Sequence, residues 1–207
     1  MIGELYYKFV SHPRAQVLRD HLVEMIPPAA KVLDVGSGDG LLASSILEKR
    51  PDVSLSGIDI LVQPHAQIPV ELYDGKLIPY PDHSFETVLF VDVLHHTNDP
   101  LALLREGGRV ARDCIIVKDH NRDSPGAAAV LRFMDWIGNS RHGIVLPYNY
   151  WSEQRWRSTF TELGFTITEY RQNLGLYPPP AKWIFDGSLH FISRLGVNAK
   201  VSNNNPL

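Results

Sequence analysis

Two pairs of adjacent residues carry side chains that can move a proton, and each pair follows an apolar run. His95 and His96 come after one run, and Asp119 and His120 come after another. A histidine whose pKa is near the ordinary value of about 6.5 accepts a proton at neutral pH, and a neighbouring carboxylate can fix its tautomer. We therefore interpret His120, oriented by Asp119, as a candidate general base, with His95 and His96 as further catalytic candidates.

A glycine-rich turn nearer the start of the chain is the most restrictive pattern in the sequence. Asp34 is followed by Gly36, Gly38 and Gly40, and Ser37 lies between the first two glycines. Glycine permits a positive φ and lets the backbone approach a ligand closely. The apolar residues on either side have the spacing of a buried strand and of a helix. Strand, turn and helix in this order predict the first unit of a doubly wound fold and a nucleotide-type cofactor.

Charge around this turn distinguishes between cofactors. Asp34 and Asp39 flank the turn, and two carboxylates would repel a pyrophosphate. The third glycine also comes one residue earlier than in the dinucleotide-binding pattern. A ligand with an ammonium and a sulfonium group would be attracted instead, which favours S-adenosylmethionine (SAM). Asp59, at the end of the second predicted strand, can accept hydrogen bonds from both ribose hydroxyls of SAM or of NAD.

In combination these motifs resemble the class I SAM-dependent methyltransferases, in particular their small-molecule branch. The match runs in register over residues 30–120 and includes the glycine turn, Asp59, Asp74-Gly75 and the segments 78–86 and 91–96. The resemblance implies transfer of the methyl group of SAM by in-line displacement, and Asp74 is a candidate to bind the adenine amino group. The implied cofactor-binding residues are Asp34, Gly36, Ser37, Gly38, Asp59, Ile60, Asp74, Gly75 and Asp92.

Two other interpretations of the polar residues stay open. His95 and His96 would, in the first, cap the next helix or pack beneath the cofactor. In the second, Asp92, Asp119 and His120 gather a divalent cation, as acidic groups do in catechol-type O-methyltransferases. That family carries Asp-Asn where this chain has Asp119-His120, so we expect no metal site.

A second group of candidates lies between residues 141 and 150. Arg141 can pair with a carboxylate or phosphate of an acceptor, whereas tyrosine gives rigid apolar surface with a polar tip. We therefore predict that Arg141, His142, Tyr148 and Tyr150 bind substrate. The alternative is that these aromatic residues close the hydrophobic core.

The elements that must position these residues follow from the hydrophobic pattern. We expect an α/β fold with a doubly wound, mostly parallel seven-stranded sheet, an antiparallel last strand, and a helical insert after the fifth strand. The last two strands, 165–170 and 188–195, are expected to form an antiparallel hairpin. The expected organisation is a single domain over 1–200, with an N-terminal helical cap over 1–29, the helical insert over 121–150 and a disordered tail over 201–207.

Composition limits the classes of function. The chain has 207 residues and a net charge of −3, which weighs against the concentrated basic face of a nucleic-acid-binding protein. Its single cysteine cannot form an internal disulfide, and no apolar run approaches the roughly 18 residues of a membrane span. The cytoplasm is therefore the expected compartment.

These observations predict a methyltransferase that acts on a small molecule, on oxygen first, with nitrogen and carbon acceptors open. No nucleic-acid partner and no membrane span are expected, and the pattern does not define an oligomeric state. Three alternatives remain: a non-catalytic SAM-binding scaffold, a protein methyltransferase, and an NAD-dependent oxidoreductase that shares the fold and Asp59.

Overall fold

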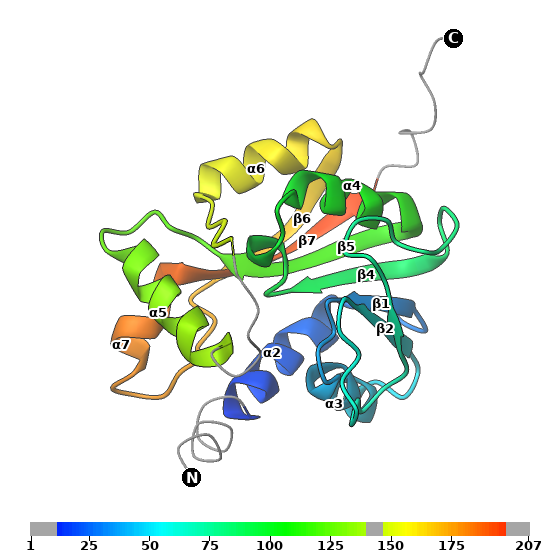
Figure 1. Cartoon of the computed structure of the whole chain (residues 1–207), viewed down its shortest axis with the longest axis horizontal. Helices are drawn as coiled ribbons and strands as arrows, with labels where there is room; N and C mark the ends of the chain where they lie inside the picture. The colour runs from blue at the N-terminus through cyan, green and yellow to red at the C-terminus, as the bar shows by residue number, and fades with distance from the viewer. Residues whose placement is uncertain (1–11, 140–146, 198–207) are drawn as a thin grey trace.

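The computed structural model of the chain describes residues 12–139 and 147–197, and it has one mixed sheet with helices on both faces (Figure 1). The seven strands follow the order β3-β2-β1-β4-β5-β7-β6. Strands β1 to β5 pair in parallel, and β7 lies antiparallel between β5 and β6. The predicted fold class is thereby confirmed.

The central strands β1, β4 and β5 are mostly buried, whereas the edge strand β3 has only three residues and none of them is buried. The parallel strands are β1 (Lys31–Val35), β2 (Ser54–Asp59), β3 (Val70–Leu72), β4 (Phe85–Val91) and β5 (Ala111–His120). The predicted hairpin is formed by β6 (Phe165–Gln172) and β7 (His190–Val197). Strand β7 begins two residues later than expected, because Gly187–Leu189 forms a short 3-10 turn, η3.

The helices form one layer on each face of the sheet and a pair beyond one end of it. The helices are α2 (His12–Met25), α3 (Leu41–Lys49), α4 (Pro100–Val110), α5 (Ala127–Asn139), α6 (Glu153–Glu162), α7 (Lys182–Phe185) and the 3-10 turn η2 (Leu94–His96). Helices α4 and α6 cover one face of the sheet, and α2 and α3 cover the other (Figure 1). Helices α5 and α7 lie beyond the end of the sheet at which β5 finishes (Figure 1). Among the described residues, no helix has the length and apolar character to cross a membrane.

The alternation of side chains along the central strands explains why both faces are covered. Val88 and Phe90 of β4 pack with α4 and α6, whereas Leu89 packs with α2 and α3. Successive residues of a strand point to opposite faces, so a strand apolar at every position needs a hydrophobic layer on each side. Cys114 is a free, buried residue of β5, as the sequence predicts.

Candidate active site

The glycine turn leaves open space at one of its three glycines. Gly36, Gly38 and Gly40 all have positive φ, at 75°, 58° and 72°. A Cβ at Gly36 would lie 2.3 Å from Cγ2 of Val93, and one at Gly40 would lie 2.7 Å from Cγ1 of Ile68. A Cβ at Gly38 would meet nothing within 4 Å. The outer glycines are therefore required by packing, and the central one leaves the backbone accessible to a ligand.

Asp59 holds this turn in place from the end of β2. Its Oδ2 accepts a hydrogen bond from the backbone N–H of Gly38 at 2.8 Å, and its Oδ1 accepts one from Leu61 at 3.0 Å. A carboxylate offers about four lone-pair sites, so both oxygens can still accept from ligand hydroxyls. The position thus fits the predicted contact with a ribose.

The acidic residues around the turn fit a cationic ligand. Burial, and then the charge of Asp59, raise the pKa of Asp34 to about 7. A positive group near Asp34 would favour its charged form. Oγ of Ser37 is buried and has no hydrogen-bond partner within the described part of the chain. The donor set and the open face at Gly38 therefore fit SAM.

Three further predicted cofactor residues lie at the exposed edge formed by β2 and β3. Ile60 has 55% of its surface exposed, and a Cβ at Gly75 would lie 3.0 Å from its Cγ2. Asp74 is also exposed, and its Oδ1 accepts hydrogen bonds from the backbone N–H groups of Lys76 and Leu77. The structure brings these predicted residues to one edge; their contact with adenine stays a prediction.

Asp92 links the glycine turn to a buried polar cluster. It directly follows β4 with a φ of 57°, next to the Val93 that packs against Gly36. Its carboxylate forms ion pairs with Arg14 of α2 and Lys118 of β5. Burial alone would raise the pKa of Asp92, but these two cations hold it well below its ordinary value. Burial in turn lowers the pKa of Lys118 to about 8, so its amine is mostly charged at neutral pH.

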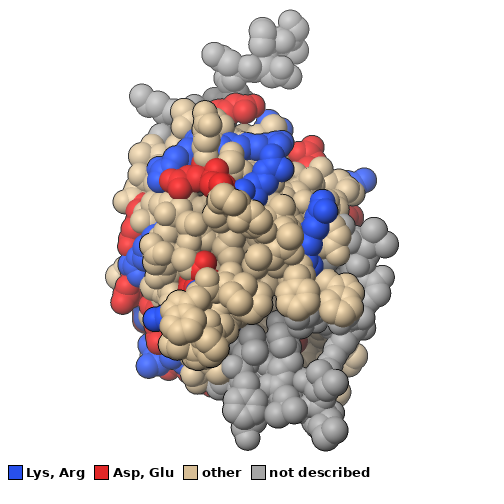
Figure 2. All heavy atoms as spheres, turned by 90° about the vertical axis from the view of Figure 1, so that its left-hand side faces the viewer, with Lys and Arg blue, Asp and Glu red and all other residues tan. Residues whose placement is uncertain are grey.

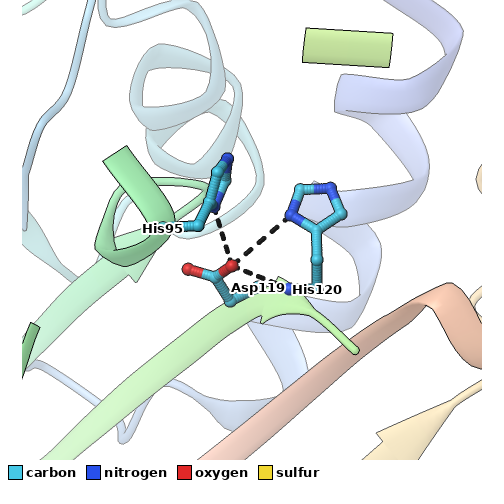
Figure 3. Close-up of side chains that lie close together, drawn as sticks. All are labelled: His95, Asp119 and His120. Atoms are coloured by element: carbon cyan, nitrogen blue, oxygen red, sulfur yellow. Dashed lines mark hydrogen bonds and ion pairs between the residues drawn. The ribbon is translucent and has the colours of Figure 1, made fainter. Parts of the chain in front are cut away.

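Two histidines converge on one carboxylate at the end of β5 (Figure 3). Nδ1 of His95 lies 2.7 Å from Oδ1 of Asp119, and Nδ1 of His120 lies 3.4 Å from the same oxygen. The backbone N–H of His120 also donates to that oxygen at 2.8 Å. All three side chains are buried, so their protonation is coupled.

His95 is held between two carboxylates. Its Nε2 lies 3.5 Å from Oδ2 of Asp135 on α5, and the hydroxyl of Tyr150 donates to that same oxygen. Burial alone would lower the pKa of His95, but Asp119 and Asp135 outweigh it and raise the pKa to about 10. His95 is therefore an imidazolium at neutral pH and has no capacity to accept a further proton.

His120 has the opposite protonation state. Burial, together with the charges of Lys118 and His95, lowers the pKa of His120 below its ordinary value. Its Nδ1 faces Asp119 and lies 3.7 Å from Oδ1 of Asp92, so we assign the proton of the neutral ring to Nδ1. At these distances Nδ1 makes no hydrogen bond among the described residues, and the other ring nitrogen, Nε2, points away from Asp119 (Figure 3). On this assignment Nε2 carries the lone pair that can accept a proton.

His96 and His190 are also neutral. Burial, and then the charge of His95, lower the pKa of His96 to about 4, and its ring lies 3.9 Å from that of His95. Burial and Lys118 hold the pKa of His190 well below its ordinary value. Nζ of Lys118 lies 3.3 Å from Nδ1 of His190, and Nε2 of that ring bonds the carbonyl of Phe185 at 2.8 Å. These contacts favour a positioning role for His190.

Among the described residues, the positive and negative charges of the cluster are equal in number. Three carboxylates oppose three cations: Asp92, Asp119 and Asp135 against Arg14, Lys118 and His95. Two groups have ligand atoms within 4.8 Å of one another: His95, Asp119 and His120, and His95, His96 and Asp135. A divalent cation would add positive charge to a cluster that is already neutral. The expectation of no metal site remains a prediction.

The substrate-binding candidates have different positions. Tyr150 is buried within the cluster, and the ring of the half-buried Tyr148 lies 6.2 Å from that of Tyr150. Arg141 and His142 lie outside the described residues, as does the tail over 201–207. The centre of the Tyr150 ring lies 5.6 Å from that of His95 and 6.1 Å from that of His120, so the structure brings this predicted residue next to both histidines.

Sequence reasoning missed four members of the cluster: Arg14, Lys118, Asp135 and His190. Asp135 had a detectable signal, because it is the only acidic residue in the otherwise mostly apolar sequence of α5. Lys118 had a weaker signal, since a lysine inside a buried strand needs a partner. Arg14 and His190 come from distant elements, and nothing in their local sequence indicates a site.

Comparison with known proteins identifies the family. A family described as a methyltransferase domain matches residues 10–170. The 27-O-demethylrifamycin SV methyltransferase of Amycolatopsis mediterranei is 31% identical over 110 residues, which are 46% of this chain and 40% of that protein. The 2-methyl-6-phytyl-1,4-hydroquinone methyltransferase of Synechocystis is 28% identical over 141 residues, 63% of this chain and 39% of that protein. The chain spans about two fifths of the length of these curated relatives.

A solved structure supports the fold at low sequence identity. A Haloferax volcanii putative methyltransferase, solved in complex with the Trm112 activator, superposes with a TM-score of 0.66 at 15% identity. The superposition covers 93% of each chain. The family match over most of the chain, the shared fold and the SAM-compatible glycine turn agree with the resemblance found in the sequence. The chain belongs to the class I SAM-dependent methyltransferase family.

Proposed function

We propose that this chain transfers the methyl group of SAM to a hydroxyl of a small-molecule acceptor, with Nε2 of His120 as the general base. The observation that carries the proposal is the convergence of His95 and His120 on one buried carboxylate, with Nδ1 atoms 2.7 Å and 3.4 Å from Oδ1 of Asp119. His95 is charged and cannot act as a base, whereas His120 is neutral, with its Nδ1 facing Asp119. A neutral imidazole oriented by a carboxylate is the arrangement that general-base catalysis requires.

The chemistry asks the chain to bind, orient and remove one proton. When bound, SAM supplies a methyl group that its sulfonium charge already activates. The residues suited to hold SAM are the glycine turn, Asp34 and Asp59. Nε2 of His120 takes the proton of the acceptor hydroxyl as the oxygen becomes methylated. Asp119 and Asp92 then stabilise the imidazolium, because both lie within 4 Å of Nδ1.

Positioning residues complete this site. His95 fixes Asp119 through its Nδ1, and Asp135 fixes His95 from the other side. The hydroxyl of Tyr150 donates to Asp135, so its ring is held next to both histidines. Alignment of reacting groups is worth several kcal/mol in such reactions. We propose that the ring of Tyr150 forms part of the wall for the acceptor.

The relatives give support for the acceptor class. The name of the Amycolatopsis protein specifies a 27-O-demethyl substrate, and the name of the Synechocystis protein specifies a hydroquinone. Both names describe small organic molecules that carry oxygen. An oxygen acceptor on a small apolar molecule is therefore our first choice for this chain, and nitrogen and carbon acceptors are tested beside it.

The test is a screen of hydroxylated aromatic compounds with isotopically labelled SAM, followed by variants. With a compound that is methylated, His120→Gln should lower kcat by about 10²- to 10⁴-fold, the usual contribution of a general base. SAM affinity, measured by calorimetry, should stay within about twofold. The matched control is His65→Gln, because His65 is exposed and distant in sequence from the cluster. Equal kcat for His120→Gln and His65→Gln would refute the assignment of the base.

The same screen separates the alternatives. Label that appears only in macromolecules would favour a protein methyltransferase. SAM binding without turnover on any acceptor would favour a scaffold. Binding of NADH in place of SAM would favour an oxidoreductase.

A further inference from the structure

The outer surfaces of α5 and α7 form an exposed aromatic face, defined by Phe133, Trp136, Trp183 and Ile184. Their exposed fractions are 50%, 62%, 76% and 59%. Phe133 joins the two helices, since its ring lies 6.4 Å from that of Trp136 and 6.4 Å from that of Phe185. In Figure 2, which views the molecule from this side, the middle of the surface is mostly uncharged. Contiguous exposed apolar patches of this kind mark interaction sites.

The charged residues of these helices are distributed unevenly. Helices α5 and α7 carry only three: Arg132, Asp135 and Lys182. Asp135 is buried and turned toward His95, whereas Arg132 and Lys182 are exposed. Asp186, which directly follows α7, is half-buried and accepts a hydrogen bond from the backbone N–H of Tyr177. The exposed charges of the two helices are therefore both positive, although the net charge of the chain is −3.

We propose that the aromatic face docks on the surface of an anionic lipid bilayer. Tryptophan is favoured where one end of the ring is apolar and the other is hydrated, as at a membrane surface. Lysine and arginine extend from such a face toward lipid headgroups, and each basic residue near an anionic surface contributes about 1 kcal/mol. A second copy of this chain fits less well, because a symmetric contact would bring like-charged residues together.

The aromatic face lies on the same two helices that hold the polar cluster. Asp135, between Met134 and Trp136 in α5, contacts His95 and Tyr150. On α7, the carbonyl of Phe185 bonds His190. One surface of each helix thus faces the cluster and another faces outward. Docking would bring an apolar acceptor dissolved in the membrane to the side of the site formed by α5 and α7. This step alone rests on the proposed function.

The test is sedimentation with lipid vesicles, which requires neither SAM nor an acceptor. The chain should bind vesicles of phosphatidylcholine with phosphatidylglycerol at least about tenfold more tightly than vesicles of phosphatidylcholine alone. Removal of one inserted apolar side chain removes about 1.5–3 kcal/mol, so Trp183→Ser should weaken binding by about 10- to 100-fold. Lys182→Glu should reduce the preference for anionic vesicles. The matched control is Leu72→Ser, which removes an apolar side chain on β3 that is 68% exposed, against 76% for Trp183.

Three outcomes would overturn the docking proposal. These are no sedimentation with anionic vesicles, equal binding by Trp183→Ser and Leu72→Ser, and a dimer in ultracentrifugation that Trp183→Ser dissociates. A failure of the proposed function is distinguishable from these outcomes, because it appears as absent turnover while vesicle binding persists. Trp183→Ser should also keep wild-type SAM affinity in calorimetry, which shows that the variant is folded.

Discussion

The glycine turn and the polar cluster lie side by side, yet they are constructed in different ways. The turn uses backbone from one short segment, 36–40, held by a single side chain from the next strand, Asp59. The cluster uses side chains from five elements or more, and each charge in it is paired with a charge from elsewhere in the chain. The turn is therefore a local structure, and the cluster depends on the tertiary fold.

This difference determines how each region responds to change. A backbone site tolerates many side chains around it but is sensitive to an added Cβ. A buried charge network is sensitive to the loss of any single partner, because the remaining charge is left without compensation in a medium of low dielectric constant. The comparison predicts large losses of stability in the cluster and mainly losses of SAM affinity in the turn.

The largest effect is expected from Asp119→Asn. This substitution leaves the buried imidazolium of His95 with one carboxylate instead of two, and it removes the charge that faces His120. Breaking a buried pair in this way costs about 3–5 kcal/mol in the free energy of unfolding, measurable by urea denaturation. The control is Asp20→Asn, whose carboxylate is 60% exposed and pairs with the neighbouring Arg19. Stability equal to that of the control would show that the cluster is not a charge network.

The glycines of the turn should separate stability from binding. Gly36→Ala places a Cβ 2.3 Å from Val93 at a positive φ, so it should cost about 2–4 kcal/mol of folding stability. Gly38→Ala adds only the backbone strain of about 1 kcal/mol, since its Cβ meets no protein atom. Gly38→Ala should nevertheless reduce SAM affinity, because its methyl group occupies the open face. Calorimetry and thermal unfolding of both variants check this, and unchanged SAM binding by Gly38→Ala would place the ligand elsewhere.

The turn is local and the cluster depends on the tertiary fold, and this difference also determines how far each could be predicted from the sequence. The fold and the turn were predicted because apolar periodicity and glycine spacing are local properties, which act within 10–20 residues. The closeness of His120 to Asp119 could be expected because the two are adjacent, but the shorter contact of Asp119, with Nδ1 of His95 at 2.7 Å, could not. The contacts of Arg14 and Asp135 with the cluster were not, because they depend on how α2 and α5 pack around the end of the sheet.

An intermediate loss of SAM affinity is expected when Asp59 or Asp74, at the edge formed by β2 and β3, is substituted. Asp59→Ala removes the hydrogen bond to Gly38 of the turn, the hydrogen bond to Leu61 just after β2, and a ribose acceptor, so SAM affinity should fall by about 10- to 100-fold. Asp74→Ala should lower it less, because Asp74 is exposed and water competes for its hydrogen bonds. Calorimetry with both variants measures the two losses, and a larger loss for Asp74→Ala would contradict the expectation that Asp59 contributes more to SAM binding than Asp74.

The smallest effect concerns the proton on Asp34. Its pKa is raised to about 7, so near pH 6 only about a tenth of the protein has the charged carboxylate, and near pH 8 most of it does. A cationic ligand binds the charged form more tightly, and the affinity for SAM should therefore rise by up to about tenfold from pH 6 to pH 8. The free energy of unfolding should change in the opposite direction, because the native protein holds the proton of Asp34 more tightly than the unfolded chain does. This stabilisation is complete below the pKa of Asp34 in the unfolded chain, and it is lost as the pH rises through about 7.

Asp34→Asn checks both signs at once. The amide imitates the protonated carboxyl, so the variant should be more stable than the wild type above pH 7 and should bind SAM with an affinity that no longer changes with pH. Calorimetry in buffers of different ionisation enthalpy should detect a proton released on SAM binding by the wild type and none by the variant. If the wild type releases no proton near pH 7, then the positive charge of SAM lies too far from Asp34 to influence it, and the charge argument for the choice of cofactor would rest on Asp39 and Asp59 alone.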